Sequence, residues 1–214
     1  MVGMTRVLVT AFEPFGGDAV NASGEAVARL AASWADPTVE LVKEILPVSF
    51  ERAPLALADA IRGHRPDAVV CIGEAGGRVA VTPERHAVNE RVARIADNDG
   101  AMLDGPIDGG PDVLETRLDV AGIVAAVRSL GVPAEGSEDA GRFVCNTVFR
   151  SVLTLFDGPA GFIHVPAVRD VGEATVGAET DAAAGRRSLE MTFEDLALAL
   201  DAVVRCVAVG LEHR

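Results

Sequence analysis

Apolar and amphipathic stretches alternate along this chain. Short, mostly apolar runs predict strands at residues 7–11, 39–48, 68–73 and 161–167. Amphipathic or Ala-rich stretches predict helices at residues 24–33, 51–62, 120–130 and 194–209. Strands that are apolar on both faces are typical of a sheet covered by helices on each side. The pattern therefore predicts an α/β fold with a layer of helices on each face of the sheet.

The stretch from 83 to 111 interrupts this pattern. It is polar and Gly-rich, and its helical periodicity is weak. Since a long irregular stretch inside a compact domain is more often functional than idle, we expect it to contribute to a site. It also carries many carboxylates: Glu84, Glu90, Asp97, Asp99, Asp104 and Asp108.

Length and charge limit what the protein can be. The 214 residues suffice for one compact domain, spanning 1–214, and leave no length for a second. With 49% hydrophobic and 24% charged residues, the composition is that of an ordinary globular protein. The formal net charge of −13 repels phosphate backbones and anionic lipid head groups, so we expect neither a nucleic-acid nor a membrane partner. Arg186 and Arg187 lie in a Gly/Ala-rich segment that we expect to be a solvent-facing loop.

The three cysteines, Cys71, Cys145 and Cys206, lie far apart and form no C-x-x-C pair. Their odd number and spacing match neither a disulfide framework nor a zinc module, so we expect no metal site. The first residues, MVGMTRVLVT, lack the features of a signal peptide, and no apolar run reaches the roughly 18 residues of a membrane span. Because reduced cysteines fit the cytosol, we expect a cytoplasmic protein. Cys71 falls within the predicted strand AVVCIG and Cys206 within the last predicted helix, so we expect both to be buried.

Cys145 is the candidate nucleophile. In FVCNTVFRSVLTLF, apolar residues recur every four positions from Val144 to Phe156, which predicts an amphipathic helix with Cys145 in its first turn. Unpaired N–H groups and the positive end of the helix dipole would stabilise the thiolate and lower the thiol pKa below about 8.5. The same N–H groups can stabilise an oxyanion. The alternative is a small buried side chain, since free cysteine is among the most buried residue types.

His164 is the best candidate for a general base. It lies in GFIHVPA, in a strand that is about to end at Pro166. A side chain there can project into the crevice at the sheet edge where α/β active sites usually lie. The alternative is a core histidine whose hydrogen bonds are satisfied internally. A third residue must orient the imidazole, but spacing alone does not select one of the carboxylates between 83 and 111.

Five segments resemble the signatures of one peptidase family. They are TAFEPFGG, IGEAGGR, ERHAVNERVARIADN, AGRFVCN and GFIHVPA. In this order they are similar to pyroglutamyl-peptidase I, also called pyrrolidone-carboxylate peptidase, from about Arg6 through the last predicted helix. The resemblance implies a catalytic triad of Cys145, His164 and Glu84. It also implies a three-layer α/β/α fold around a twisted, mixed but mostly parallel sheet, no metal or cofactor, and a homotetramer.

The implied reaction is removal of an N-terminal pyroglutamyl residue from peptides. Cys145 would attack the carbonyl to form an acyl-enzyme, while His164 transfers protons and Glu84 holds the imidazole. The lactam ring needs an apolar slot with one donor and one acceptor. The resemblance implies that this slot is formed by Phe12, Phe15, Asn21, Glu74, Phe143 and Val144, and that Arg94 stabilises charge at the reacting carbonyl. Core packing is the alternative for the two phenylalanines of FEPF.

Several residues near the implied site depart from the family pattern. Glu74 stands where the family usually has Gln, and an ionised Glu, which only accepts hydrogen bonds, would repel the lactam carbonyl. A desolvated, protonated Glu74 could still both donate and accept. The other departures are Ala22, Pro83, Ala96, Asp139 and Arg142. These changes leave open a cysteine amidase or esterase of the same fold that acts on another acyl group. A non-catalytic module that binds peptide N-termini is an alternative of a different class.

Overall fold

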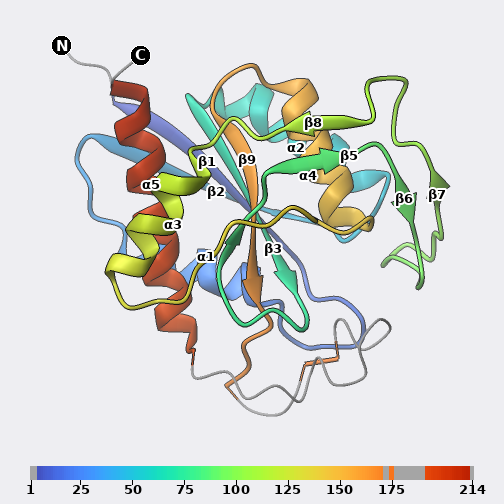
Figure 1. Ribbon diagram of the computed structural model, residues 1–214, viewed down its shortest axis with the longest axis horizontal. Helices are drawn as coiled ribbons and strands as arrows, with labels where there is room; N and C mark the ends of the chain where they lie inside the picture. The colour runs from blue at the N-terminus through green and yellow to red at the C-terminus, as the bar shows by residue number, and fades with distance from the viewer. Residues whose placement is uncertain (1–3, 171–173, 176–190, 213–214) are drawn as a thin grey trace.

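A five-stranded sheet forms the centre of the molecule (Figure 1). The computed structural model describes residues 4–170, 174–175 and 191–212. In spatial order the strands are β2 (Val39–Leu46), β1 (Thr5–Phe12), β3 (Ala68–Ala75), β9 (Ala160–Pro166) and β4 (Thr82–Pro83). Every neighbouring pair is parallel except β9 and β4, which are antiparallel. The predicted mixed, mostly parallel sheet is therefore confirmed.

Helices cover both faces of this sheet. On one face lie α1 (Ala22–Ser33), α3 (Val120–Ser129) and α5 (Phe193–Glu212), and on the other lie α2 (Arg52–His64) and α4 (Val144–Leu155) (Figure 1). Because successive side chains of a strand point to opposite faces, β3 contributes to both cores. Val70 and Ile72 pack in the core beneath α1 and α5, whereas Val69 and Cys71 pack in the core beneath α2 and α4. The fold is thus a three-layer α/β/α arrangement, as predicted.

The ends of several elements differ from the prediction, and two of the differences matter for function. Helix α1 begins at Ala22 rather than at 24, because the Asn21 side chain caps it by accepting the N–H of Ser23 at 3.0 Å. Strand β3 runs on to Ala75, so Glu74 lies inside the strand and not in the loop after it. The paired arginines Arg186 and Arg187 lie outside the described residues.

The polar stretch from 83 to 111 is more regular than its sequence predicts. It includes the short strands β5 (His86–Val88), β6 (Arg91–Val92) and β7 (Asp104–Gly105), and β8 (Val113–Glu115) follows it. Strand β5 pairs with β8 and β6 with β7, each pair antiparallel, on the side of the molecule where α4 lies (Figure 1). Strands of two or three residues are too short to show a period of two, which explains why the sequence pattern missed them.

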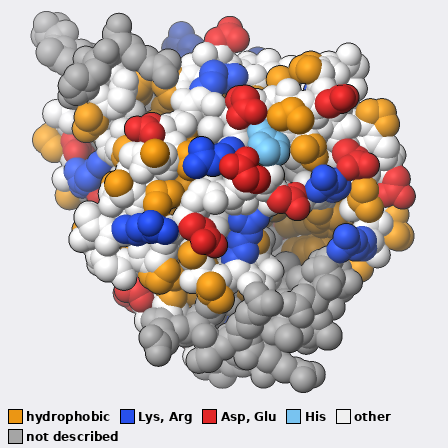
Figure 2. All heavy atoms as spheres, viewed as in Figure 1, with side chains coloured by type: hydrophobic (Ala, Val, Ile, Leu, Met, Phe, Trp, Pro, Cys, Tyr) orange, Lys and Arg blue, Asp and Glu red, His pale blue; other side chains and the backbone are white. Residues whose placement is uncertain are grey.

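The surface shown in Figure 2 mixes both signs of charge. Acidic and basic side chains lie next to one another there, and no continuous basic patch crosses this face. Among the helices in the described part of the chain, none is both long and apolar enough to cross a membrane.

Candidate active site

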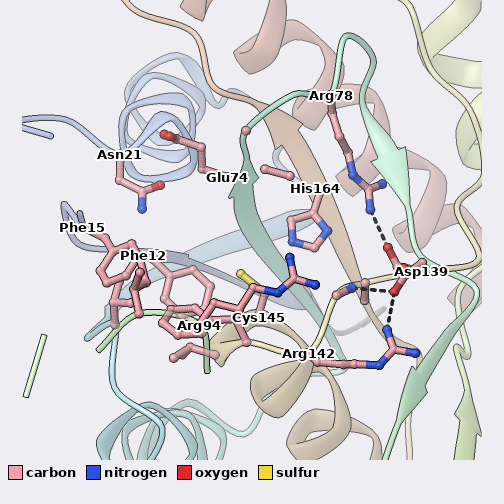
Figure 3. Close-up of a pocket in the computed structure, with 18 of the residues that line it drawn as sticks. Phe12, Phe15, Asn21, Glu74, Arg78, Arg94, Asp139, Arg142, Cys145 and His164 are labelled. Carbon is pink, nitrogen blue, oxygen red and sulfur yellow. Dashed lines mark hydrogen bonds and ion pairs between the residues drawn. The ribbon is translucent and has the colours of Figure 1, made fainter. Parts of the chain in front are cut away.

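A cavity of about 520 Å³ opens at the carboxyl ends of β1 and β3, next to β9 and the start of α4. This is the edge of a parallel sheet at which α/β proteins usually place their ligands. Figure 3 shows Cys145 and His164 in the middle of the cavity, with Phe12 and Phe15 on one side and Asp139 on the other. The two candidate catalytic side chains come from different elements, and the fold brings them into one cavity.

Cys145 is the second residue of α4, as the sequence predicts for a thiol in the first turn. Gly141, whose φ is 74°, provides the left-handed turn that lets the chain enter the helix. The thiol lies directly over Gly73 of β3. A Cβ atom at position 73 would come within 2.9 Å of the Cys145 Sγ atom and 2.7 Å of the Phe162 ring. Only glycine therefore leaves room for the thiol at this point of the sheet.

The expectation of a lowered thiol pKa is wrong. The pKa of Cys145 is raised to about 12, mainly by burial and in addition by the negative charges of Glu84 and Glu74, against the opposing charge of Arg78. Position at a helix N-terminus does favour thiolate, but it does not compensate for the loss of water around the sulfur. At neutral pH Cys145 is therefore a thiol, and it can act as a nucleophile only if a base takes its proton.

His164 lines the same cavity and is the candidate for that base. It is almost fully buried in β9, and its Nδ1 atom lies 2.7 Å from the Oε1 atom of Glu84. Strand β4 pairs with β9 just before Glu84, and the Glu84 N–H donates to the carbonyl of Phe162 at 2.9 Å, which fixes the glutamate beside the imidazole. Burial lowers the pKa of His164, and this effect exceeds the opposing influence of Glu84. The imidazole is thus neutral at neutral pH.

Glu84 is ionised and orients the imidazole. Burial alone would raise the pKa of Glu84, but the hydrogen bond from His164 and the positive charge of Arg78 lower it below its ordinary value. Since an ionised carboxylate only accepts hydrogen bonds, the Nδ1 atom of His164 must be the donor. The Nε2 atom of His164 then remains as an acceptor for a proton.

Arg78 is a member of this cluster to which the sequence analysis gave no role. Its guanidinium lies 2.9 Å from the Oε1 atom of Glu84 and also donates to the backbone carbonyl of Asp139 at 2.6 Å (Figure 3). The side chain lines the cavity and is only about a quarter exposed. Its place in the IGEAGGR segment was the one available signal.

The aromatic residues form the opposite wall of the cavity. The rings of Phe15 and Phe143 lie 5.3 Å apart between centroids, and Phe50 meets Phe143 edge-on at 4.9 Å. Phe12 and Val144 also line the cavity, although both are almost fully buried and belong to the core beneath α2 and α4. Core packing and a role in the cavity wall are therefore combined in these two residues.

The comparisons with known proteins show the family to which this chain belongs. The model of the pyroglutamyl peptidase family matches residues 5–206. The chain belongs to the pyroglutamyl peptidase family. Over 168 residues it is 41% identical to the pyrrolidone-carboxylate peptidase of Bacillus amyloliquefaciens and 43% identical to that of Bacillus licheniformis; each alignment covers 75% of this chain and 78% of the relative.

Solved structures of this family have the same fold. The crystal structure of pyroglutamyl peptidase I from Bacillus amyloliquefaciens aligns with a TM-score of 0.84 and 34% identity, covering 96% of this chain and 95% of that chain. The pyrrolidone carboxyl peptidase from Thermococcus litoralis aligns with a TM-score of 0.85 and 31% identity, covering 98% of this chain and 96% of that chain.

Two further residues implied by the resemblance to pyroglutamyl peptidases also line the cavity. The side chain of Asn21 is occupied in capping α1, and its Nδ2 atom donates to the carbonyl of Glu13 at 3.0 Å. Arg94 is exposed, and Figure 3 shows its guanidinium near the Cys145 sulfur and the imidazole of His164.

Glu74 differs from the Gln usual in pyroglutamyl peptidases, and the structure shows where its charge lies. Its side chain is 3% exposed and forms a bidentate ion pair with Arg169, with distances of 2.7 and 3.0 Å. Burial raises the pKa of Glu74, and the Arg169 charge offsets only part of this effect. At another departure, Asp139 pairs with Arg142 at 3.0 Å at the rim of the cavity.

The remaining cysteines lie away from the cavity lining. Cys71 is fully buried, as predicted, but Cys206 is partly exposed, so the prediction that it is buried is wrong. Cys206 lies on α5 beside a small surface hollow that also includes Arg117 and Asp119. No group of three or more His, Cys, Asp or Glu side chains in the described segments is arranged to hold a metal ion.

Proposed function

We propose that this protein is a cysteine peptidase that removes an N-terminal pyroglutamyl residue from peptides, with Cys145, His164 and Glu84 as its catalytic residues. The observation that carries the proposal is the shared cavity of the thiol and the imidazole, in a chain that belongs to the pyroglutamyl peptidase family. The 2.7 Å contact between His164 and Glu84 supports the assignment of roles. A related amidase or esterase with another acyl group, and a non-catalytic binding module, are not favoured by the comparisons.

The mechanism follows from the protonation states of the three groups. The Nε2 atom of His164 takes the proton of the Cys145 thiol as the sulfur attacks the carbonyl carbon of the pyroglutamyl group. The new S–C bond forms while the carbonyl electrons move to the oxygen. Glu84 stabilises the imidazolium that results. Collapse of this intermediate breaks the C–N bond, and His164 returns the proton to the leaving amine.

The second half of the reaction regenerates the thiol. Water attacks the thioester while the Nε2 atom of His164 accepts one of its protons, and collapse releases pyroglutamate and Cys145. In both halves the negative oxygen needs donors. The first N–H groups of α4, including that of Cys145, have no acceptor within the helix and can donate to this oxygen. The positive charge of Arg94 at the cavity supports the same role.

The substrate class fits the cavity wall. A pyroglutamyl group is a small, uncharged lactam, and the rings of Phe12, Phe15 and Phe143 offer an apolar slot of matching character. Val144 extends this wall next to the nucleophile. The names of the curated relatives support the same acyl group.

We also propose that residues 1–214 act as one catalytic domain and that the protein is a cytoplasmic homotetramer. The match of the family model to residues 5–206 supports a single catalytic domain. The three free cysteines fit a reducing compartment. The sequence resemblance supports the tetramer, which light scattering after gel filtration can test.

The proposed function is tested with a pyroglutamyl amide of a fluorophore, under reducing conditions at neutral pH. We expect the wild type to release the fluorophore and Cys145→Ala to lose about 10⁴-fold or more in kcat. Cys206→Ala is the matched control, because Cys206 lies on α5 outside the cavity, and it should retain wild-type activity. Prolyl and glutamyl amides should be poor substrates. Absence of release by a folded wild type, or equal rates on all three amides, would contradict the proposal.

A further inference from the structure

Glu74 points away from the catalytic side chains. In β3 the neighbouring Gly73 faces Cys145 and Phe162, and Ile72 faces the core beneath α1. Since side chains alternate along a strand, Glu74 lies on the same face as Ile72 and opposite to the face of the thiol. Figure 3 agrees, because the carboxylate of Glu74 is directed toward the start of α1 and away from Cys145. The residue borders the cavity, but its charge is directed elsewhere.

Both carboxylate oxygens of Glu74 have protein partners. The Oε2 atom accepts the N–H of Ala22 and a donor of Arg169, and the Oε1 atom accepts a second donor of Arg169 at 2.7 Å. The Ala22 N–H is one of the unpaired donors at the start of α1, where a negative charge is favourable. The carboxylate therefore fixes the first residue of α1 directly after Asn21.

Arg169 connects this point to the loop between β1 and α1. Its Nη1 atom donates to Glu74 and to the carbonyl of Val168, and its Nη2 atom donates to Glu74 and, at 2.7 Å, to the carboxylate of Asp18. Asp18 in turn accepts the N–H of Thr175 at 3.0 Å, and the Thr175 hydroxyl donates to the carbonyl of Gly16 at 2.9 Å. The side chains of Asp18, Arg169 and Glu74 are each less than one-tenth exposed. A buried ionic cluster thus connects the middle of the loop that carries Phe15 to the start of α1.

We propose that Glu74 is a positioning residue for the lactam pocket, and that its charge serves this cluster and is not presented to the substrate. Together with Arg169 and Asp18 it holds the start of α1 and the loop from 13 to 20, and so the wall formed by Phe15 and Asn21. The inference rests on the proposed function for the identity of the bound group. On this inference, Glu74 in place of the family's Gln changes the contacts that fix the pocket wall and leaves the specificity for the acyl group intact.

The test is a double-mutant cycle of Glu74→Gln, Arg169→Met and the combined variant. Arg169→Met leaves two buried carboxylates without their shared cation, so we expect KM for the pyroglutamyl amide to rise by about 10- to 100-fold, with kcat changed less than about threefold. Glu74→Gln keeps an acceptor for Ala22, and Asp18 still pairs with Arg169, so its KM should rise only about threefold. The combined variant should return to within about threefold of Glu74→Gln, since it removes the extra charge.

A second readout does not need turnover. Protection of Cys145 from iodoacetamide by 2-pyrrolidone, followed by peptide mass spectrometry, reports occupancy of the pocket. Protection should be weakest in Arg169→Met, and in the combined variant it should recover to about the level of Glu74→Gln. Arg205→Met is the matched control, because Arg205 also bridges two carboxylates, Asp36 and Asp201, but on the surface. It should change neither readout.

Three results would overturn the inference. One is a combined variant whose KM is as high as that of Arg169→Met. Another is an Arg169→Met variant in which kcat falls by as large a factor as KM rises. The third is a Glu74→Gln variant that alters the ratio of pyroglutamyl to prolyl hydrolysis by about tenfold or more, which would mean that Glu74 contacts the lactam. If the wild type binds 2-pyrrolidone but hydrolyses nothing, the proposed function fails, and the cycle measured by protection still decides the positioning role.

Discussion

Two buried glutamates lie at the candidate active site, Glu74 in the lining of the cavity and Glu84 in contact with His164, and their pKa values shift in opposite directions. Glu84 and Glu74 are each almost completely shielded from solvent, and the Oε1 atom of each lies within 3 Å of an arginine. Yet the pKa of Glu84 lies below its ordinary value, whereas the pKa of Glu74 lies above it. For both, burial is the largest influence and raises the pKa. The hydrogen bonds and charges around each glutamate therefore decide whether its pKa is raised or lowered.

The partners differ in charge balance. Glu84 receives a hydrogen bond from His164 as well as the charge of Arg78, and both favour its ionised form. Glu74 shares Arg169 with a second carboxylate, Asp18, which disfavours ionisation. In the proposed function Glu84 orients His164 and stabilises its cation, whereas Glu74 belongs to the ionic cluster that we propose holds the loop from 13 to 20. Side-chain type and burial alone do not distinguish these roles.

The two regions are Glu84 with His164 and Arg78, and Glu74 with Arg169 and Asp18. The largest expected contrast between them comes from matched Glu→Gln changes. Glu84→Gln removes the carboxylate that orients His164 and stabilises its cation, so we expect kcat to fall by about 10³-fold, with KM nearly unchanged. Glu74→Gln should affect KM only, by about threefold. Steady-state kinetics on the pyroglutamyl amide measures both. Comparable kcat losses in the two variants would erase the distinction.

Gly73→Ala tests the boundary between the two regions. Its Cβ atom would lie 2.9 Å from the Cys145 Sγ atom and 2.7 Å from the Phe162 ring, so the thiol must move. We expect kcat to fall by about 10²-fold because attack geometry is sensitive to displacements of this size. The ion pairs of Glu74 with Arg169 should persist, so KM should change little. A variant with wild-type kcat would show that the thiol tolerates the displacement. Gly63→Ala on α2, where a Cβ has open space, is the control.

The two regions also differ in how well the sequence predicts them. Periodicity alone predicts Cys145 at a helix start and His164 near the end of a buried strand. Glu84 lies 80 residues before His164 among several carboxylates, so only the family resemblance selected it. Spacing carries no information on which loop side chain reaches an imidazole across the sheet edge.

Pairing and burial account for what the sequence did not reveal. Arg169 and Gly73 matter because of residues far away in sequence, Asp18 and Cys145, and no local pattern marks such contacts. The pKa of Cys145 was mispredicted for the same reason, since a helix N-terminus is visible in the sequence and the depth of burial is not. The main strands and helices were predicted because their periodicity is local.

Arg78→Met sharpens the comparison through pH. The charge of Arg78 lowers the pKa of His164, so its removal should raise that pKa and move the acidic limb of kcat/KM to higher pH. We expect a loss of about threefold to tenfold in kcat/KM at pH 6 and a smaller loss at pH 8. Arg169→Met, on the Glu74 side, should leave the limb in place. A limb that shifts equally in both variants would show that the two arginines act on His164 alike.

The smallest effect is a difference in the sign of pH-dependent stability. Because burial raises the pKa of Glu74, the folded protein holds this proton more tightly than the unfolded chain does. Glu74 therefore lowers the free energy of unfolding as pH rises from about 4.5 to its folded pKa, by at most about 1.4 kcal/mol per pH unit. The pKa of Glu84 is lowered, so Glu84 contributes stability that is lost as pH falls below about 4.5.

Urea unfolding of the two Glu→Gln variants and the wild type across this pH range measures both contributions. For Glu74→Gln, the free energy of unfolding of the variant minus that of the wild type should increase as the pH rises above about 4.5, since the substitution removes a group whose ionisation opposes folding. For Glu84→Gln, the free energy of unfolding of the variant minus that of the wild type should decrease as the pH rises toward about 4.5, because that substitution removes a group whose ionisation favours folding. Slopes of the same sign would mean that the two carboxylates have equivalent surroundings, and the contrast between a catalytic and a positioning glutamate would then lose its electrostatic basis.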